Sequence, residues 1–412
     1  MFFIPVLLPA SEPASAQKDP GKTKRNVRFV WNNRPSLRFG DWLRVDFRVK
    51  LQADFRGFSP ELETDEGTFD FHRKRVGIEG TFLRHFEYEV ERELRESNPW
   101  RDVFVNVRYF RNFQVRVGKF KIPFGLDQLT SPVRLDFVFR SRIGDTLAPA
   151  RDIGVAAHGR FFRRGLNYEA GFFQQDGENA RSGESLGAGR TFAGRVTGTP
   201  LRLLEIPDVI GNLELGVAFT TGSVPEGLNS VRAQTDAGKT FFPSIYVNGN
   251  RLRLGLDLNW SPGPFSIKGE FMHLQDERRS QGLLGQDLPD LISRGWYVSG
   301  TWAVTGERKI EGIEPRKNFL RGGIGAVELA GRYEQLRFGS SEHPGPPLRN
   351  PRASNILGNS DRVWTVGANW YLNRWAKIQA NAIRETIEDT LRSPIPGRER
   401  FWMWILRLQF VL

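Results

Sequence analysis

The sequence predicts an all-β fold, a closed barrel of sixteen antiparallel strands that crosses a membrane. Three observations lead to this prediction. Apolar and charged residues alternate with a period of two in many segments. Most of these segments have about ten residues or more, the length that a tilted strand needs to cross a bilayer. The connections between them alternate between tight turns and long polar stretches, as in barrels of outer membranes.

Composition excludes the main competing classes of protein. The 412 residues contain 32 Phe, 11 Trp and 7 Tyr, whereas 26% of the chain is charged. No apolar run approaches the 18 residues of a membrane helix, so a helical membrane protein is excluded. The absence of Cys excludes disulfide scaffolds, thiol catalysis and zinc sites built from thiolates. A net charge of +12 favours anionic partners.

The N-terminal segment resembles a secretion signal. Residues 1–16, "MFFIPVLLPASEPASA", hold a short apolar stretch followed by Ala14-Ser15-Ala16, a typical cleavage pattern. No Lys or Arg precedes the apolar stretch, and two prolines interrupt it, so a terminus without a targeting role is the alternative. We predict a signal peptide over 1–16 and a single barrel over 17–412.

The first predicted strand, 42–55, shows the alternation most clearly. One face of "WLRVDFRVKLQADF" carries Leu43, Val45, Phe47, Val49, Leu51, Ala53 and Phe55. The other face carries Arg44, Asp46, Arg48, Lys50, Gln52 and Asp54. No amphipathic helix produces a strict period of two, so this segment is a strand with one apolar and one ionic face.

The same pattern predicts fifteen further strands. The sixteen segments are 42–55, 69–82, 85–95, 101–110, 113–122, 152–163, 166–175, 189–200, 211–222, 250–260, 264–275, 294–305, 324–338, 361–372, 375–387 and 399–412. Several ionic faces carry three or four charges, which suits a hydrated lumen. A soluble sandwich or propeller, the alternative, has shorter and more evenly spaced strands.

Connection lengths set the orientation of the barrel. Tight turns are predicted at Arg84-His85, Arg111-Asn112, Arg163-Arg164-Gly165, Ser261-Pro262-Gly263 and Asn373-Arg374. Long loops are predicted at 56–68, 123–151, 176–188, 223–249, 276–293, 339–360 and 388–398. Two connections break the alternation, because 96–100 is short and 306–323 is long. An even strand count places both termini on the short-turn, periplasmic side.

Tryptophans near the strand ends are expected to form the aromatic girdles of a membrane barrel. They are Trp260, Trp296, Trp302, Trp364, Trp370, Trp402 and Trp404.

Several segments resemble the phosphate-selective porin O/P family. They are "LRFGDWLRVDFRVKLQADF" (37–55), "VGKFKIPFGLDQL" (117–129), "FRSRIGDTLAPARDIGVAAHGRF" (139–161), "GAVELAGRYEQLRF" (325–338) and "VGANWYLNRWAKIQANAI" (366–383). The resemblance covers roughly 36–412. It implies a trimeric, sixteen-stranded porin for passive uptake of phosphate or other small anions through a lumen lined by Arg and Lys. Such barrels usually end with Phe, whereas Leu412 takes that position here.

The resemblance also implies the surroundings of the protein. We expect it in the outer membrane of a Gram-negative-type bacterium, in contact with the lipid bilayer and with lipopolysaccharide.

Eleven basic residues are the candidates for the anion path. In sixteen-stranded porins the long third loop, here 123–151, folds into the lumen, and Arg134, Arg140, Arg142 and Arg151 lie on it. Lys119 and Lys121 stand at its base. Alternation turns Arg44, Arg48, Lys50, Arg73 and Arg75 toward the same lumen. Asp127, Asp136 and Asp145 leave the loop only weakly positive.

A row of cations lets an anion exchange its hydration shell for several weak sites in turn. Arg binds two phosphate oxygens with its planar fork, whereas Lys acts as a point charge. The alternative is that these residues are ordinary wall charges, because Glu87, Glu89, Glu91 and Glu93 face the same lumen. The protein would then be a weakly selective general porin, or a structural or adhesive barrel without transport.

No motif indicates an enzyme, a metal site or a cofactor. The five histidines, His72, His85, His158, His273 and His343, show no ligand spacing and no grouping with a nucleophile. The glycine-rich stretches lack the strand-to-helix context of a phosphate-binding loop. The basic run at 72–75 alternates between the two faces of a strand, so nucleic-acid binding is not expected.

Overall fold

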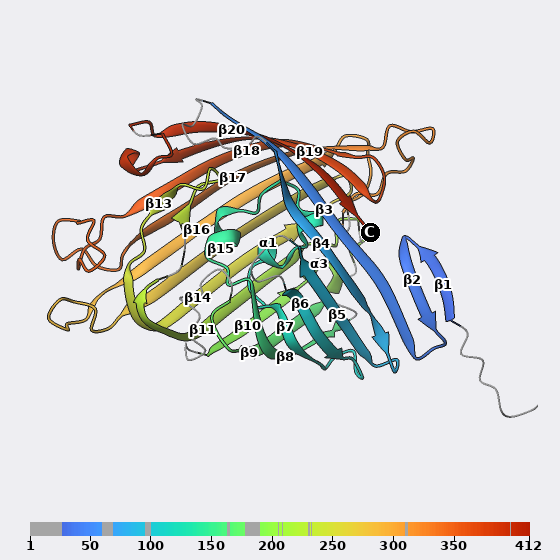
Figure 1. Cartoon of the computed structure of the whole chain (residues 1–412), viewed down its shortest axis with the longest axis horizontal. Helices are drawn as coiled ribbons and strands as arrows, with labels where there is room; N and C mark the ends of the chain where they lie inside the picture. The colour runs from blue at the N-terminus through green and yellow to red at the C-terminus, as the bar shows by residue number, and fades with distance from the viewer. Residues whose placement is uncertain are drawn as a thin grey trace, which may run out of the picture.

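The computed structural model is a β-barrel with few helices (Figure 1). It describes residues 27–59, 69–94, 100–162, 165–177, 190–204, 206–207, 209–229, 231, 233–309, 312–395 and 397–412. The predicted signal peptide, 1–16, lies outside the described residues. Within the described part of the chain, no helix combines the length and the apolarity that crossing a bilayer requires.

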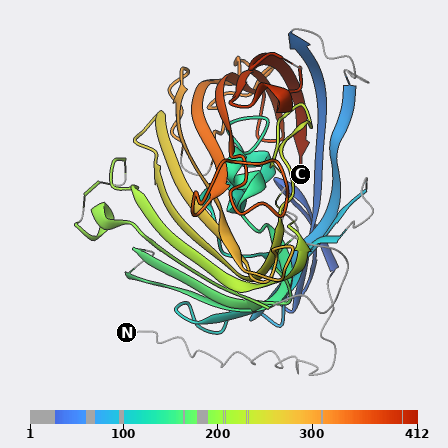
Figure 2. The ribbon, with the colours of Figure 1, turned by 90° about the vertical axis from the view of Figure 1, so that its left-hand side faces the viewer.

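Sixteen antiparallel strands form the closed barrel. They are β3 (Leu43–Ser59), β4 (Phe69–Phe82), β5 (Phe86–Glu93), β6 (Trp100–Val107), β7 (Gln114–Lys121), β8 (Arg151–Phe161), β9 (Leu166–Phe173), β10 (Thr191–Gly198), β11 (Glu214–Leu228), β14 (Tyr246–Trp260), β15 (Phe265–Arg278), β16 (Leu288–Ala303), β17 (Ala326–Ser340), β18 (Asn359–Tyr371), β19 (Ala376–Ile387) and β20 (Arg400–Val411). Each pairs with the next, and β20 pairs with β3 to close the sheet (Figures 1 and 2). The predicted strand count is confirmed.

Alternation puts the polar face inside the barrel and the apolar face outside. In β3, Lys50 and Asp54 are buried, whereas Phe47, Leu51 and Phe55 are about 40% exposed. Four of the largest fully buried side chains in the described residues are arginines. A soluble protein would bury the apolar face instead, so the solvent on the outside of this barrel is lipid.

The wall of the barrel is uneven. In one part of the wall, β5, β6, β7, β9 and β10 each have 8 residues. On the other side, the strands from β14 to β20 have 12 to 16 residues. We call the strands β3–β10 the short wall, although β3 and β4 themselves are long, and we call β14–β20 the long wall.

Two strands of the sheet were not predicted. β1 (Val27–Asn32) and β2 (Arg34–Phe39) form a hairpin beside the barrel (Figure 1). β20 pairs with β3 between Lys50 and Ser59, and β2 pairs with the remaining end of β3, from Leu43 to Asp46. The hairpin therefore continues the barrel wall below the end of β20.

Several strands continue into stretches that were predicted as loops. β11 runs to Leu228, β14 begins at Tyr246 and β16 begins at Leu288, so the predicted limits at 222, 250 and 294 were wrong. The backbones of neighbouring strands stay paired beyond the part of the strand that contacts lipid, as in β11 and β14. Outside the membrane no apolar alternation is required, so the sequence pattern does not reveal these extensions. The residues between β11 and β14 also form a small hairpin, β12 (Ala233–Gln234) and β13 (Thr240–Phe242).

Two connections, 96–100 and 306–323, were predicted to break the alternation of short turns and long loops. The one between β16 and β17 is long, as predicted. In the connection between β5 and β6, residues 95–99 lie outside the described part of the chain.

Candidate functional site

The segment between β7 and β8 lies inside the barrel (Figure 2). It forms the short helices α1 (Leu126–Leu129) and α2 (Arg142–Thr146), with one 3-10 turn at Pro132–Arg134 between them. Its backbone is hydrogen bonded to inward-facing side chains of several strands. Arg407 donates to the Val138 carbonyl at 2.6 Å, and the Leu126 amide donates to Glu270 at 2.7 Å.

Arg142 anchors this segment to the long wall. Its guanidinium is 3.0 Å from Asp236 and 3.0 Å from Asp361, and it also pairs with Glu385. Its amide donates to Glu334 at 2.5 Å. Burial alone would lower the pKa of Arg142, but these carboxylates together raise it above its ordinary value.

Asp136 is the second anchor, with opposite charge. Its carboxylate accepts hydrogen bonds from Lys268 at 2.8 Å and from Lys309 at 2.6 Å. Its carbonyl accepts one from Asn369 at 2.8 Å. Burial would raise the pKa of Asp136, but the two ammonium groups hold it well below its usual range.

An apolar cluster fills the space between the segment and the long wall. Phe124, Ile143 and Leu147 of the segment pack in one cluster with Phe241 and Phe242 of β13. Leu336 and Phe338 of β17 belong to the same cluster. The inner side of the long wall is therefore covered where this cluster lies.

On the short wall, most of the predicted cations are paired with carboxylates. Arg48 is 2.8 Å from Glu79 and also pairs with Glu89. Lys50 pairs with Glu91. These acidic partners lie on β4 and β5. We call Glu79, Glu87, Glu89, Glu91 and Glu93 the acidic stripe, and it reduces the positive field of the basic residues.

Arg75 and Arg44 are held in the same way. Arg75 is 2.8 Å from Glu93 and 3.2 Å from Glu91. Arg44 is 3.2 Å from Asp46 at the short-turn end of β3.

Three predicted cations are bonded mainly to neutral oxygen atoms. Arg73 donates to the Gln52 amide oxygen, and Lys121 donates to the carbonyls of Gln128, Leu129 and Thr130 at 2.5 to 3.1 Å. Arg140 donates to the carbonyls of Asp127 and Thr130, and its nearest ion pair, to Asp145, is 4.0 Å long. Burial lowers the pKa of Arg140, and Asp127 and Asp145 oppose this effect.

The remaining predicted residues have different positions. Arg151 pairs with Asp102 at 2.7 Å, and Arg134 is exposed at a cavity. Lys119 does not join the group in the lumen. It lies opposite Val103 and Ile153 in the sheet, on the lipid-facing side, and its ammonium donates to the Trp100 carbonyl at 2.8 Å.

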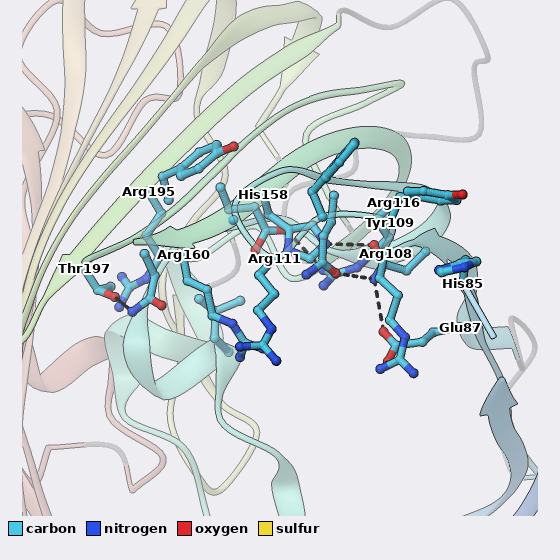
Figure 3. A pocket seen from close by; sticks show the side chains of 18 of the residues that line it. His85, Glu87, Arg108, Tyr109, Arg111, Arg116, His158, Arg160, Arg195 and Thr197 are labelled. Carbon is cyan, nitrogen blue, oxygen red and sulfur yellow. Dashed lines mark hydrogen bonds and ion pairs between the residues drawn. The ribbon is translucent and has the colours of Figure 1, made fainter. Parts of the chain in front are cut away.

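A first cavity, of about 960 Å³, opens at the short-turn rim (Figure 3). Six arginines line it, namely Arg84, Arg108, Arg111, Arg116, Arg160 and Arg195, against three glutamates, Glu87, Glu169 and Glu214. Arg108 is 2.7 Å from Glu87, and Arg116 is 3.1 Å from Glu169. The guanidinium groups of Arg111 and Arg160 form no ion pair with the described residues. Positive charge therefore exceeds negative charge in this cavity.

A second cavity, of about 830 Å³, lies on the other side of the inner segment. Thr130 and residues before it line the first cavity, and Ser131 and residues after it line the second. The basic side chains of the second cavity are Arg34, Arg48, Lys50, Arg134, Arg308, Arg374 and Lys377, and the acidic ones are Glu79 and Glu314. The predicted residues Arg48, Lys50 and Arg134 meet here.

The sequence did not single out most of the basic residues of the two cavities. Arg84 and Arg111 were assigned to tight turns, and Arg34 lies on the hairpin that was not predicted. The one available signal was the frequency of arginine at the short turns, which all meet at the same rim of a barrel.

Within the described residues, no group of three or more His, Asp or Glu side chains is arranged to hold a metal ion.

Comparison with known proteins gives the family. Residues 44–411 match the family described as phosphate-selective porin O and P. The chain belongs to this family. A search of curated proteins found no match.

Several solved structures share the fold, among them an outer-membrane protein and a porin. OmpT of Vibrio cholerae has a TM-score of 0.58 at 12% identity, over 90% of this chain and 98% of the other. An anion-selective porin from Comamonas acidovorans has a TM-score of 0.56 at 13% identity, over 89% and 99%. OprB of Pseudomonas putida has a TM-score of 0.56 at 10% identity, over 89% and 94%. The chain is thus an outer-membrane porin, with the family and fold of a channel.

Proposed function

We propose that this porin carries small anions, phosphate among them, along the short wall. One observation carries the proposal: the charges of Arg73 and Lys121 are held by neutral oxygen atoms and are not cancelled by a contacting carboxylate. The excess of basic side chains in both cavities supports the same direction of selectivity. An anion that leaves these residues would enter a rim that also attracts it.

The chemistry of the path suits weak, repeated binding. An arginine fork bonds two phosphate oxygens at once, and a lysine adds a point charge. Conduction also requires that each site release the ion. The carboxylates beside Arg48, Lys50 and Arg75 compete with a bound anion and so favour its release.

The test is a current measurement on the purified porin in a planar bilayer. A salt gradient of KCl should give a reversal potential of the sign expected for chloride permeation. Added phosphate should then reduce the chloride current, if phosphate binds in the same path. A reversal potential near zero would contradict the preference for anions. A chloride current that phosphate does not change would contradict phosphate binding, but not the preference for anions.

A weakly selective general porin is the second candidate. The ion pairs between β3, β4 and β5 favour it, because basic and acidic residues on one wall largely neutralise each other. A barrel without transport is a third candidate, because the segment between β7 and β8 and the strand β13 pack together against the inside of the long wall. Absence of single-channel steps would support this third candidate.

We also propose that the protein is exported and forms trimers. The cleavage pattern before Gln17 supports export, and N-terminal sequencing of the membrane protein should begin there. An intact Met1 would contradict cleavage. The family resemblance supports a trimer, and one similar OmpT structure is described as a trimer form. Native mass measurement should give three copies per particle.

A further inference from the structure

Four arginines face outward on adjacent strands of the long wall. They are Arg294 on β16, Arg337 on β17, Arg362 on β18 and Arg384 on β19, and we call them the arginine belt. Arg294 and Arg337 are direct cross-strand partners, and Arg384 lies opposite Trp364 and Trp402. Their neighbours along each strand are buried and point inward, so the belt lies on the face that contacts lipid.

The belt lies at one edge of the apolar band. Trp302, at the short-turn end of β16, is eight residues from Arg294, and Trp370 is eight residues from Arg362. Eight residues span roughly 26 Å along a strand, or about 20 Å along the membrane normal at the usual tilt. The apolar band of such barrels is about 25 Å tall. The belt therefore lies near the outer edge of the apolar band, where the long arginine side chains reach the outer-leaflet headgroups.

A row of aromatic side chains lies next to the belt on its membrane side. The rings of Trp296 and Tyr333 are 5.4 Å apart, and those of Tyr333 and Trp364 are 4.5 Å apart. The guanidinium of Arg384 lies 5.8 Å from the ring of Trp402. Below this row, Val298, Leu329 and Val366 are about half exposed to lipid.

The four arginines lack a counter-charge among the residues that the structure describes. No hydrogen bond or ion pair joins any of their guanidinium groups to a described residue. Asp290, further along β16, accepts a hydrogen bond from Gln275 instead, and Glu388 accepts one from Ser360. Like charges on neighbouring strands repel each other and are costly in lipid, so an anion from outside the chain would stabilise them.

We propose that the arginine belt binds the phosphate groups of an anionic glycolipid in the outer leaflet. Charge complementarity supports this occupant, because an arginine fork matches a phosphate group. Continuity supports it as well, since the belt, the aromatic row and the apolar surface follow one another in the order of headgroup, interface and acyl chain. The belt faces away from the lumen, so the site is independent of the proposed anion path.

The test compares lipid binding by two variants of the full-length porin in detergent. The belt variant carries Arg294→Gln, Arg337→Gln, Arg362→Gln and Arg384→Gln. The control variant carries Arg28→Gln, Arg316→Gln, Lys317→Gln and Arg321→Gln, which removes the same charge from exposed positions near the short-turn side. The probes are bisphosphorylated lipid A and lipid A from which both phosphates have been removed, and bound lipid is counted by native mass spectrometry.

The wild type and the control variant should bind the phosphorylated lipid roughly tenfold or more tightly than the belt variant. The dephosphorylated lipid should bind all three weakly. Equal loss in both variants, or equal binding of both lipids, would overturn the proposal. A belt variant that changes the number of copies per particle would show instead that a second copy covers this face.

Two further measurements keep the test valid. A variant with Arg→Lys at the four belt positions retains the charge and should keep most of the lipid binding. It serves as the test variant should the glutamine variant fail to fold. The reversal potential of the belt variant in a planar bilayer should equal that of the wild type. A changed reversal potential with unchanged lipid binding would show that these residues determine ion selectivity, and the proposed lipid site would then be wrong.

Discussion

The short wall and the long wall of the barrel use the same alternating pattern for different purposes. On the long wall, inward charges hold the inner segment, as Arg142 does with Asp361 and Asp136 does with Lys268. On the short wall, inward charges pair with one another or line open cavities. A charged inward residue is therefore evidence of a hydrated interior, but its role depends on what lies opposite. The difference between the walls can be tested one residue at a time.

Removal of the Arg142 anchor should have the largest effect. Arg142→Ala leaves Asp236, Asp361 and Glu385 buried without their cation, which costs about 3–5 kcal/mol of unfolding free energy. The inner segment should then detach, so single-channel currents should become larger and noisier. Arg321→Ala, at an exposed arginine, is the control and should change neither property. Quiet currents and an unchanged thermal transition in Arg142→Ala would show that the other contacts suffice.

Neutralisation of Arg73 and Lys121, whose hydrogen-bond partners are uncharged, should remove most of the anion selectivity. We expect Arg73→Gln combined with Lys121→Gln to lower the anion-to-cation permeability ratio several-fold, because no contacting carboxylate compensates these charges. The matched control is Arg48→Gln combined with Glu89→Gln, which removes an ion pair without changing net charge. Reversal potentials in a KCl gradient distinguish the two. Equal shifts of the reversal potential in both variants would mean that anion selectivity does not depend on Arg73 and Lys121.

The Asp136 anchor should resist acid. Because Lys268 and Lys309 hold the pKa of Asp136 below its ordinary value of about 3.9, its stabilising charge persists as the pH falls toward that value. It is lost only when the pH falls through the lower pKa of the folded state. Current noise should therefore stay constant from pH 7 to pH 4 in the wild type. Asp136→Asn should be noisy throughout this range, and noise that first rises near pH 4 in the wild type would refute the assignment.

Release of the acidic stripe should have the smallest effect. Glu87→Gln combined with Glu89→Gln removes the carboxylate partner of Arg108 and one of the partners of Arg48, which keeps Glu79, so anion preference should rise slightly. Glu226→Gln combined with Glu277→Gln, near the long loops, is the control for net charge. A fall in anion preference would show that these glutamates position the arginines rather than mask them.

The sequence allowed the fold to be predicted but only part of the site. A period of two, repeated in segments such as 42–55, requires strands with one polar face, and closure follows from the number of segments. Alternation also turned Arg48, Lys50 and Arg75 inward. Alternation also placed Glu91 and Glu93 on the same lumen face, but the individual ion pairs, and the part played by Glu79, follow only from strand register. Lys119 was misplaced because the predicted register did not fix the face on which β7 presents it.

Two other features were beyond sequence reasoning for physical reasons. Arg142 is an anchor because the inner segment carries it to β17, β18 and β19, and nothing local encodes that path. The hairpin of β1 and β2 has short strands that need the edge of β3 to be stable. Its alternation alone does not distinguish it from an unpaired arm.

The position of that hairpin has a consequence for the order of folding. Asn33, at its tip, accepts hydrogen bonds from Arg374 and from the Trp375 indole, which belong to the connection between β18 and β19. β2 also takes up the length of β3 that β20 leaves unpaired. These contacts exist only after the last strands have reached the first one. The hairpin precedes every strand of the barrel in the chain and is nevertheless among the last segments to dock, where it joins the first and last strands of the barrel from the periplasmic side.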